Sequence, residues 1–138
     1  MIYSVPYCTT NISKTIRKSN VLNTYYAELL AIFEATKQIT KLLFSPIHFI
    51  WEVSIYSDSQ AALKVLRNPQ QQCSQPLIRK TLEITHAISA QTGLRINFHW
   101  VPGHAGIKGN EDAHILAQQA MIEGKQTPTT VCLKTVML

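Results

Sequence analysis

The sequence predicts a single α/β domain in which a mixed β-sheet is flanked by helices. Strand-like and helix-like segments alternate along most of the chain, which is typical of α/β folds. The 138 residues are enough to bury one sizeable core. Hydrophobic residues make up 46% of the chain and recur regularly, which excludes an intrinsically disordered protein.

The first half of the chain predicts a β-rich start, a long helix and a buried strand. Residues 2–5 and 9–21 are expected to form a hairpin. A helix is expected over residues 24–43, because Thr24 is a good N-cap and apolar residues follow at helical spacing. Residues 49–57 are largely apolar and predict a short strand buried on both faces. The buried stripe of the helix is expected to contain Leu29, Ile32, Phe33, Ile39 and Leu43.

The second half predicts three helices and one strand. Helices are expected at residues 58–67 and 76–91, and the second of them has a proline in its first turn and Gly93 after its end. Residues 94–100 alternate between apolar and polar side chains, which predicts a strand. A last helix is expected over residues 110–123.

Composition narrows the class of partner and the compartment. Thirteen Lys and Arg against eight Asp and Glu give a net charge of +5, which favours polyanionic partners, although a solvated basic surface explains the scattered charges equally well. The three cysteines form no CxxC pair, so they predict neither a disulfide framework nor a zinc site. We find neither an apolar run of about 18 residues nor a signal-peptide pattern. We therefore expect a soluble intracellular protein, in cytoplasm or nucleus, without membrane contact.

Two carboxylates stand where α/β folds gather functional groups. Asp58 directly follows a predicted strand, and Glu28 is expected in the first turn of a predicted helix. Each also has an ordinary structural interpretation, Asp58 as a helix N-cap and Glu28 as a carboxylate favoured near a helix N-terminus. Together they suit metal-assisted phosphodiester hydrolysis, in which a pair of divalent cations activates water and stabilises the leaving oxygen.

Three motifs give this chemistry a family resemblance. They are Ala-Glu-Leu at residues 27–29, Tyr-Ser-Asp-Ser-Gln-Ala-Ala at 56–62 and Trp-Val-Pro-Gly-His at 100–104. In this order, with these interleaved elements, they resemble the motifs of ribonuclease H domains, above all those attached to retroelement reverse transcriptases. The resemblance covers residues 1–124 and leaves 125–138 as a C-terminal tail.

The resemblance implies a nuclease that cleaves the RNA strand of RNA–DNA hybrids endonucleolytically. Glu28 and Asp58 would be its catalytic metal ligands, for Mg²⁺ or alternatively Mn²⁺. His104 would be a catalytic loop histidine that moves protons near the attacking water or the leaving product. The substrate-binding residues would be Ser59, Gln60 and Asn110. The partners would be the hybrid and a larger reverse-transcriptase polyprotein, while no pattern indicates an oligomeric state.

Two of the four acids of the family are missing. The first is an Asp on the opening central strand, and no aspartate precedes Asp58. We therefore expect a ribonuclease H-like sheet without that strand and an impaired activity, caused by a cut gene model or by a degenerate element. The fourth acid is replaced by His114, whose imidazole suits Mn²⁺ better than Mg²⁺. His114 is expected to be a weak metal ligand or a residue at the edge of the site. Asp112 lies about 200° around the helix from Asn110 and is not expected in the site.

Other functions remain open at this point. The main alternative is a non-catalytic nucleic-acid-binding remnant of the same fold. An integrase-like or exonuclease-like enzyme is disfavoured by the Gly-His pair at 103–104 followed by Asn-Glu at 110–111. His99, His104 and His114 lack the spacing of a zinc site, and no Gly-rich turn predicts dinucleotide binding.

Overall fold

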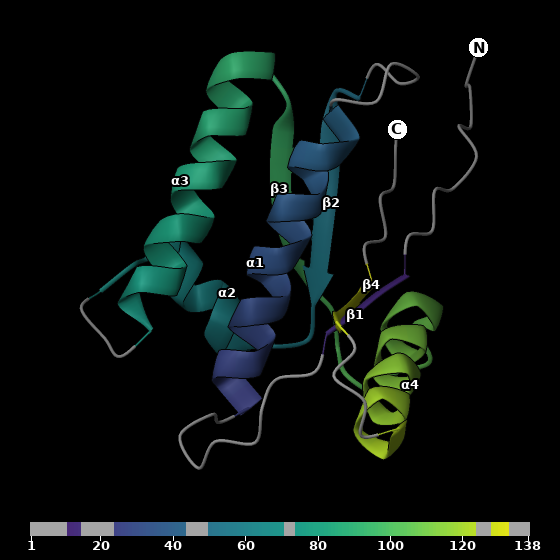
Figure 1. Cartoon of the computed structure of the whole chain (residues 1–138). Coiled ribbons are helices and arrows are strands. Elements are labelled where there is room, and N and C mark those ends of the chain that lie inside the picture. Colours follow the sequence, from purple (N-terminus) through teal and green to yellow (C-terminus); the bar gives the residue numbers. More distant parts are fainter. Residues whose placement is uncertain (1–10, 15–23, 44–49, 71–73, 124–127, 133–138) are drawn as a thin grey trace.

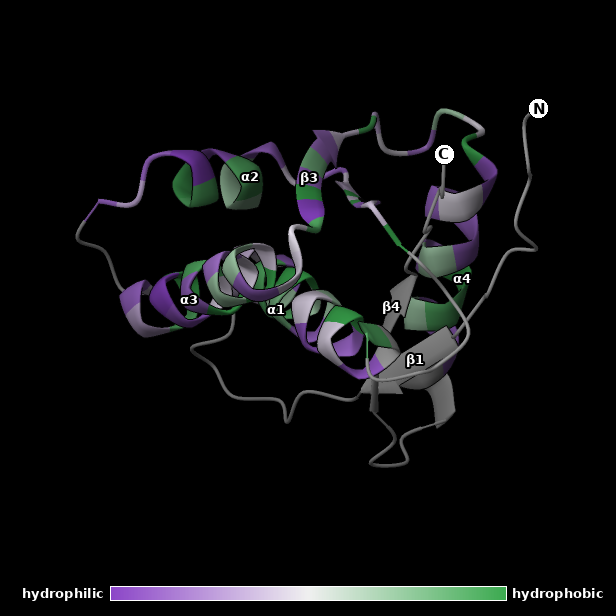
Figure 2. Cartoon of the chain, turned by 90° about the horizontal axis from the view of Figure 1, so that it is seen from above, coloured by the Kyte–Doolittle hydropathy of each residue, from purple (hydrophilic) through white to green (hydrophobic). Residues whose placement is uncertain are grey.

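The computed structural model describes residues 11–14, 24–43, 50–70, 74–123 and 128–132. Its elements, in chain order, are β1 (Asn11–Lys14), α1 (Thr24–Leu43), β2 (Glu52–Ser57), α2 (Gln60–Arg67), α3 (Gln75–Thr92), β3 (Arg95–Trp100), α4 (Lys108–Glu123) and β4 (Pro128–Cys132). Figures 1 and 2 both place α1 beside α3, while α4 lies with β1 and β4. The predicted α/β class is confirmed.

The central strands β2 and β3 pair in parallel, from Glu52 opposite Arg95 to Ser57 opposite Trp100. Because α2 and α3 lie between them in the sequence, the pair is a strand–helix–strand crossover, the connection that parallel strands require. In the described part of the chain, β2 has β3 as its only strand partner. Among the described residues this parallel pair is the central sheet, and its carboxyl edge carries Ser57 and Trp100.

The helix α1 anchors the core because one side of it is apolar along its length. The predicted stripe is confirmed at Leu29, Ile32 and Ile39, which are buried, whereas Phe33 and Leu43 are only partly buried. Figure 2 shows hydrophobic and polar residues alternating around α1 and α3, as in amphipathic helices. One apolar cluster joins α1 to β2 and α3, and a second joins it to α2 and α3. Both strands that end at the site are thus fixed to one scaffold.

Local signals at the ends of α2 and α3 confirm most of the predicted boundaries. Asn68 caps the C-terminus of α2 and precedes a proline. The helix α3 carries a proline in its first turn and ends at Gly93, whose φ of 72° is the left-handed conformation that glycine adopts at least cost. These short-range signals determine where β3 begins. They therefore also determine the position of Trp100 at its carboxyl end.

Two expectations differ from the structure. Residues 128–132, expected in a trailing tail, form β4, which pairs antiparallel with β1. The helix α4 begins at Lys108 rather than near residue 110. Most of the expected N-terminal hairpin lies outside the described residues. In the part of the chain that can be described, no helix is long and apolar enough to cross a membrane.

Candidate active site

The carboxyl ends of β2 and β3 bring two separate loops together. The indole Nε1 of Trp100 donates a hydrogen bond to the backbone oxygen of Asp58 at 3.2 Å. The backbone N–H of Val101 donates to the carbonyl of Ser57 at 3.0 Å, which continues the ladder past the end of β3. The loop after β3 is therefore held against the residue that follows β2.

The side chain of Asp58 is free for chemistry because Ser59, not Asp58, caps α2. The Ser59 hydroxyl accepts the backbone N–H of Ala62 at 3.3 Å, as an N-cap does. The N-cap interpretation of Asp58 is therefore wrong. Instead, the amide of Asn110 donates to Asp58 Oδ2 at 3.4 Å, across 52 residues of sequence.

The loop after β3 approaches the same carboxylate closely at Gly103. A Cβ atom at this position would lie 3.1 Å from Asp58 Oδ2, tighter than ordinary van der Waals contact. Glycine thus lets the backbone of the loop pass beside Asp58 without displacing its carboxylate.

Glu28 is partly buried and senses the charge of Asp58. The structure places it in the second turn of α1 rather than in the first. Burial, and secondly repulsion from Asp58, raise the pKa of Glu28 above its ordinary value of 4.5. A carboxylate whose ionised form is disfavoured next to a second carboxylate forms a site that a divalent cation would stabilise.

His104, in the loop after β3, and His114, on α4, contact each other. Their rings lie 4.8 Å apart between centroids in an edge-to-face arrangement. His104 has a φ of 53°, an uncommon conformation for a residue other than glycine, so the loop turns sharply there. The Nε2 atom of His114 lies 3.2 Å from Gln118 Nε2, one helical turn further along α4. The predicted loop histidine and the residue at the fourth acid position are thus neighbours.

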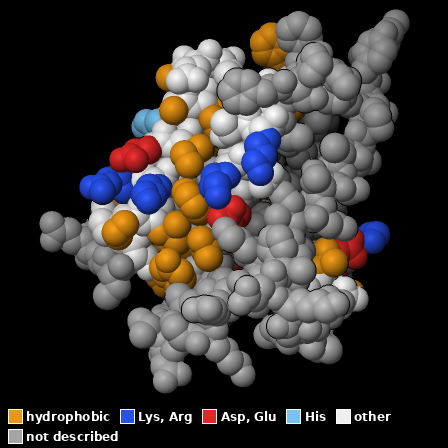
Figure 3. Space-filling model, in the orientation of Figure 1, with side chains coloured by type: hydrophobic (Ala, Val, Ile, Leu, Met, Phe, Trp, Pro, Cys, Tyr) orange, Lys and Arg blue, Asp and Glu red, His pale blue; other side chains and the backbone are white. Residues whose placement is uncertain are grey.

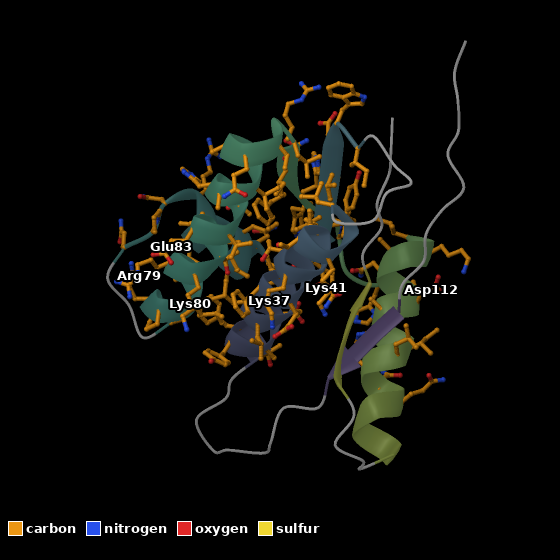
Figure 4. The ribbon with its side chains drawn as sticks, turned by 45° about the horizontal axis from the view of Figure 1, so that its top comes forward. Lys37, Lys41, Arg79, Lys80, Glu83 and Asp112 are labelled. Atoms are coloured by element: carbon orange, nitrogen blue, oxygen red, sulfur yellow. The ribbon has the colours of Figure 1, made fainter. Side chains whose placement is uncertain are left out.

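The remaining residues considered in the sequence have different local roles in the structure. Gln60 is exposed at the first position of α2, and Ser59 uses its hydroxyl in the cap. Asp112 forms an ion pair with Lys108 at 2.9 Å on α4, where Figure 4 labels it, in agreement with its expected absence from the site. The hydrogen bond from Trp100 was not foreseen, since no pattern in the sequence pairs that indole with the Asp58 carbonyl.

The three histidines considered for zinc do not converge. The ring of His99 stacks on Tyr56 with centroids 5.1 Å apart, and its Nε2 lies 3.3 Å from the Ser54 hydroxyl. Among the residues that can be described, no three His, Cys, Asp or Glu side chains form a metal-binding group. Two carboxylates still fit one hard cation, because Mg²⁺ commonly keeps several waters and binds protein through one or two carboxylates.

The comparison with known families gives a match over most of the chain. Residues 3–122 match the RNase H family, and this stretch contains Glu28, Asp58, His104 and His114. No solved structure matches the chain. Because the match extends over most of the sequence and includes the whole candidate site, the chain belongs to the RNase H family.

Proposed function

We propose that the chain binds RNA–DNA hybrids and hydrolyses the RNA strand endonucleolytically. The observation that best supports this is the Asp58 carboxylate, which is left out of the helix cap and lies close enough to Glu28 to influence its ionisation. Membership of the RNase H family indicates ribonuclease chemistry. The net charge of +5 suits a polyanionic substrate.

The chemistry of the donor set fits one divalent cation, Mg²⁺ or Mn²⁺, between Glu28 and Asp58. When bound, the cation would activate water and stabilise the leaving oxygen of the scissile phosphodiester. Asn110 would hold the Asp58 carboxylate in one orientation through its 3.4 Å contact. His114 would join the ligand set weakly, or else serve only as a contact for His104.

The other site residues would act on the substrate and on protons. His104, on the turn of the exposed loop, would accept or donate a proton at the attacking water or at the leaving oxygen. Its edge-to-face contact with His114 would restrict the orientations of its ring. Ser59 and Gln60, at the start of α2, would lie along the substrate backbone.

We propose further that the 138-residue chain is a weak nuclease and acts with a retroelement reverse transcriptase inside the cell. Its three motifs resemble that type of domain most. The low activity is inferred from position 114, where an imidazole stands in place of the family's fourth acid. Since imidazole binds Mn²⁺ more readily than Mg²⁺, we expect Mn²⁺ to support more cleavage.

The test is cleavage of a labelled RNA–DNA hybrid with Mg²⁺ and with Mn²⁺. We expect slow cleavage that Asp58→Asn lowers by about a hundredfold or more, because losing several kcal/mol of transition-state stabilisation costs tenfold per 1.36 kcal/mol. The matched control is Asp112→Asn, which removes the same charge from an exposed ion pair on α4. Equal rates for Asp58→Asn and the wild type would contradict the proposed site.

Two other results distinguish the alternatives. Fast cleavage that Asp58→Asn abolishes would contradict the proposed impairment. Salt-dependent binding of the hybrid without any turnover would support a non-catalytic binding domain instead. That second function is favoured by one observation, the presence of only two carboxylates at the described site.

A further inference from the structure

A second feature adjoins the carboxylates. The elements α2, α3 and β3 line an open surface groove with a volume of about 870 Å³. We call it the α2–α3 groove. Its volume falls in the range of pockets that bind small molecules or parts of larger ligands. The apolar part of its lining consists of Leu63, Leu66, Leu82, Ile96, Phe98 and Trp100.

The charged side chains that line the groove are all basic. Lys64 and Arg67 project from α2, His86 lies on α3, and no Asp or Glu lines the groove. Lys64 and Arg67 are exposed and form no ion pair with any described acid. An apolar floor with a cationic rim is complementary to a ligand that has flat apolar surfaces and negative charges.

The groove is continuous with the candidate site through two residues. Trp100 and Gln60 line the groove and also stand at the ends of β3 and α2, where Asp58 lies. The hydrogen bond from Trp100 to the Asp58 carbonyl fixes the indole at this boundary, and half of the residue is exposed. A strand of nucleic acid at Asp58 could therefore extend into the groove.

The basic side chains on the face formed by α1 and α3 differ from those of the groove because acidic side chains lie among them. Figure 4 labels Lys37 and Lys41 on α1 and Arg79, Lys80 and Glu83 on α3, and Figure 3 shows acidic side chains among the Lys and Arg side chains of this face. Lys37 pairs with Glu34 at 3.0 Å, and Arg79 pairs with Glu83 at 3.6 Å. This face combines both signs of charge, so it is a less selective surface for a polyanion.

We propose that the α2–α3 groove binds a single-stranded extension of the nucleic acid held at Asp58. Single strands are bound by aromatic and apolar surfaces that stack unpaired bases and by cations that follow the phosphates. Here Trp100 and the apolar floor would receive the bases, and Lys64 and Arg67 would contact the phosphates. A duplex keeps its bases stacked inside and would leave the apolar floor uncovered. This inference rests on the proposed hybrid binding.

The first experiment uses Trp100 as a reporter. The sequence has two tryptophans, so Trp51→Phe leaves Trp100 alone, and Trp51 is 70% exposed and outside the groove lining. Titration with oligothymidylate should quench the emission of Trp100. In this background, Lys64→Glu/Arg67→Glu should weaken the binding about tenfold or more and lower its salt dependence.

A matched control separates the groove from general charge. Lys41→Glu/Lys80→Glu makes the same change in net charge with two exposed lysines outside the groove lining. We expect it to weaken oligothymidylate binding much less. Melting curves by circular dichroism check that both double variants are folded. Equal losses in the two variants would overturn the proposal, because binding would then depend on net charge alone.

The second experiment compares a blunt RNA–DNA hybrid with one that carries a single-stranded tail, by fluorescence anisotropy. The tailed hybrid should bind at least about fivefold more tightly, and Lys64→Glu/Arg67→Glu should remove that difference. Equal affinity of the wild type for both hybrids would overturn the groove proposal alone, whereas no binding of either would contradict the proposed function. Quenching of Trp100 by an acidic amphipathic peptide but not by oligothymidylate would identify a protein-docking groove and also overturn the proposal.

Discussion

At the scale of single residues, the carboxylates of Glu28 and Asp58 lie close enough for the charge of Asp58 to affect the pKa of Glu28. Neither carboxylate caps a helix, since Ser59 caps α2 and Glu28 lies beyond the first turn of α1. Burial, and secondly repulsion from Asp58, disfavour the ionised form of Glu28 and raise its pKa. Groups kept at such a cost are typical of functional sites.

Glu28→Gln should therefore stabilise the protein at neutral pH when no divalent cation is present. The pKa of Glu28 is higher in the folded state than in the unfolded state, so the folded state holds the proton more tightly. Ionisation then lowers stability as pH rises from 4.5 through the raised pKa. Melting temperatures measured in EDTA should show a gain for Glu28→Gln at pH 7 that shrinks towards pH 4.

The control for this prediction is Glu83→Gln, an identical change at an exposed position on α3. It should show no comparable gain at neutral pH, because its carboxylate is solvated and pairs with Arg79. A loss of stability in Glu28→Gln that is the same at pH 4 and pH 7 would mean that the Glu28 carboxylate makes a favourable contact.

The helix α2 is the element that links the fold to the site. Its N-cap lies directly after Asp58, its first residue lines the groove, and its buried Ala62 and Leu66 join it to α1 and α3. Only eight residues long, it depends on its cap and on packing, because isolated helices of this length are unstable in water.

Ser59→Ala should cost about 1 kcal/mol of unfolding free energy, the usual value for removing an N-cap side chain. Urea unfolding followed by circular dichroism measures this difference. Ser74→Ala is the matched control, since Ser74 is the N-cap of α3 but makes no capping hydrogen bond with its side chain. If the two variants lose the same stability, the Ser59 hydroxyl does not act as a cap.

Both apolar clusters of the described residues form around α1. Leu29 is completely buried and lies next to Glu28, so it fixes the helix position that supplies the site carboxylate. The strands β2 and β3 are joined to α1 and α3 through the other cluster. The position of the carboxylates relative to each other is therefore a property of the core.

Leu29→Ala should destabilise the protein by about 2–5 kcal/mol, because the lost burial leaves a cavity in the core. This is a large part of the total stability of a typical domain, about 5–15 kcal/mol. Ile115→Ala, at an exposed position on α4, should cost far less. Chemical denaturation of both variants tests the prediction, and similar costs would place Leu29 outside the stabilising core.

Much of the fold could be predicted because its signals are local. Helical spacing and Thr24 located α1, and Gly93 located the end of α3, since each signal acts within a few residues. The strand β4 was missed because a segment of five residues forms a strand only when a partner is present, and its partner β1 lies far away in the sequence.

The residue types and their order were sufficient to identify the family and to propose the carboxylates Glu28 and Asp58 and the loop histidine His104 as site residues. The tertiary structure alone decided that Asp58 is free of the cap, that His99 lies apart from His104, and that a cationic groove continues from the site. The reason is physical: caps and helical periodicity act over a few neighbouring residues. Burial, repulsion between charges and a hydrogen bond such as the one from Asn110 to Asp58 depend on segments that only the folded core brings together.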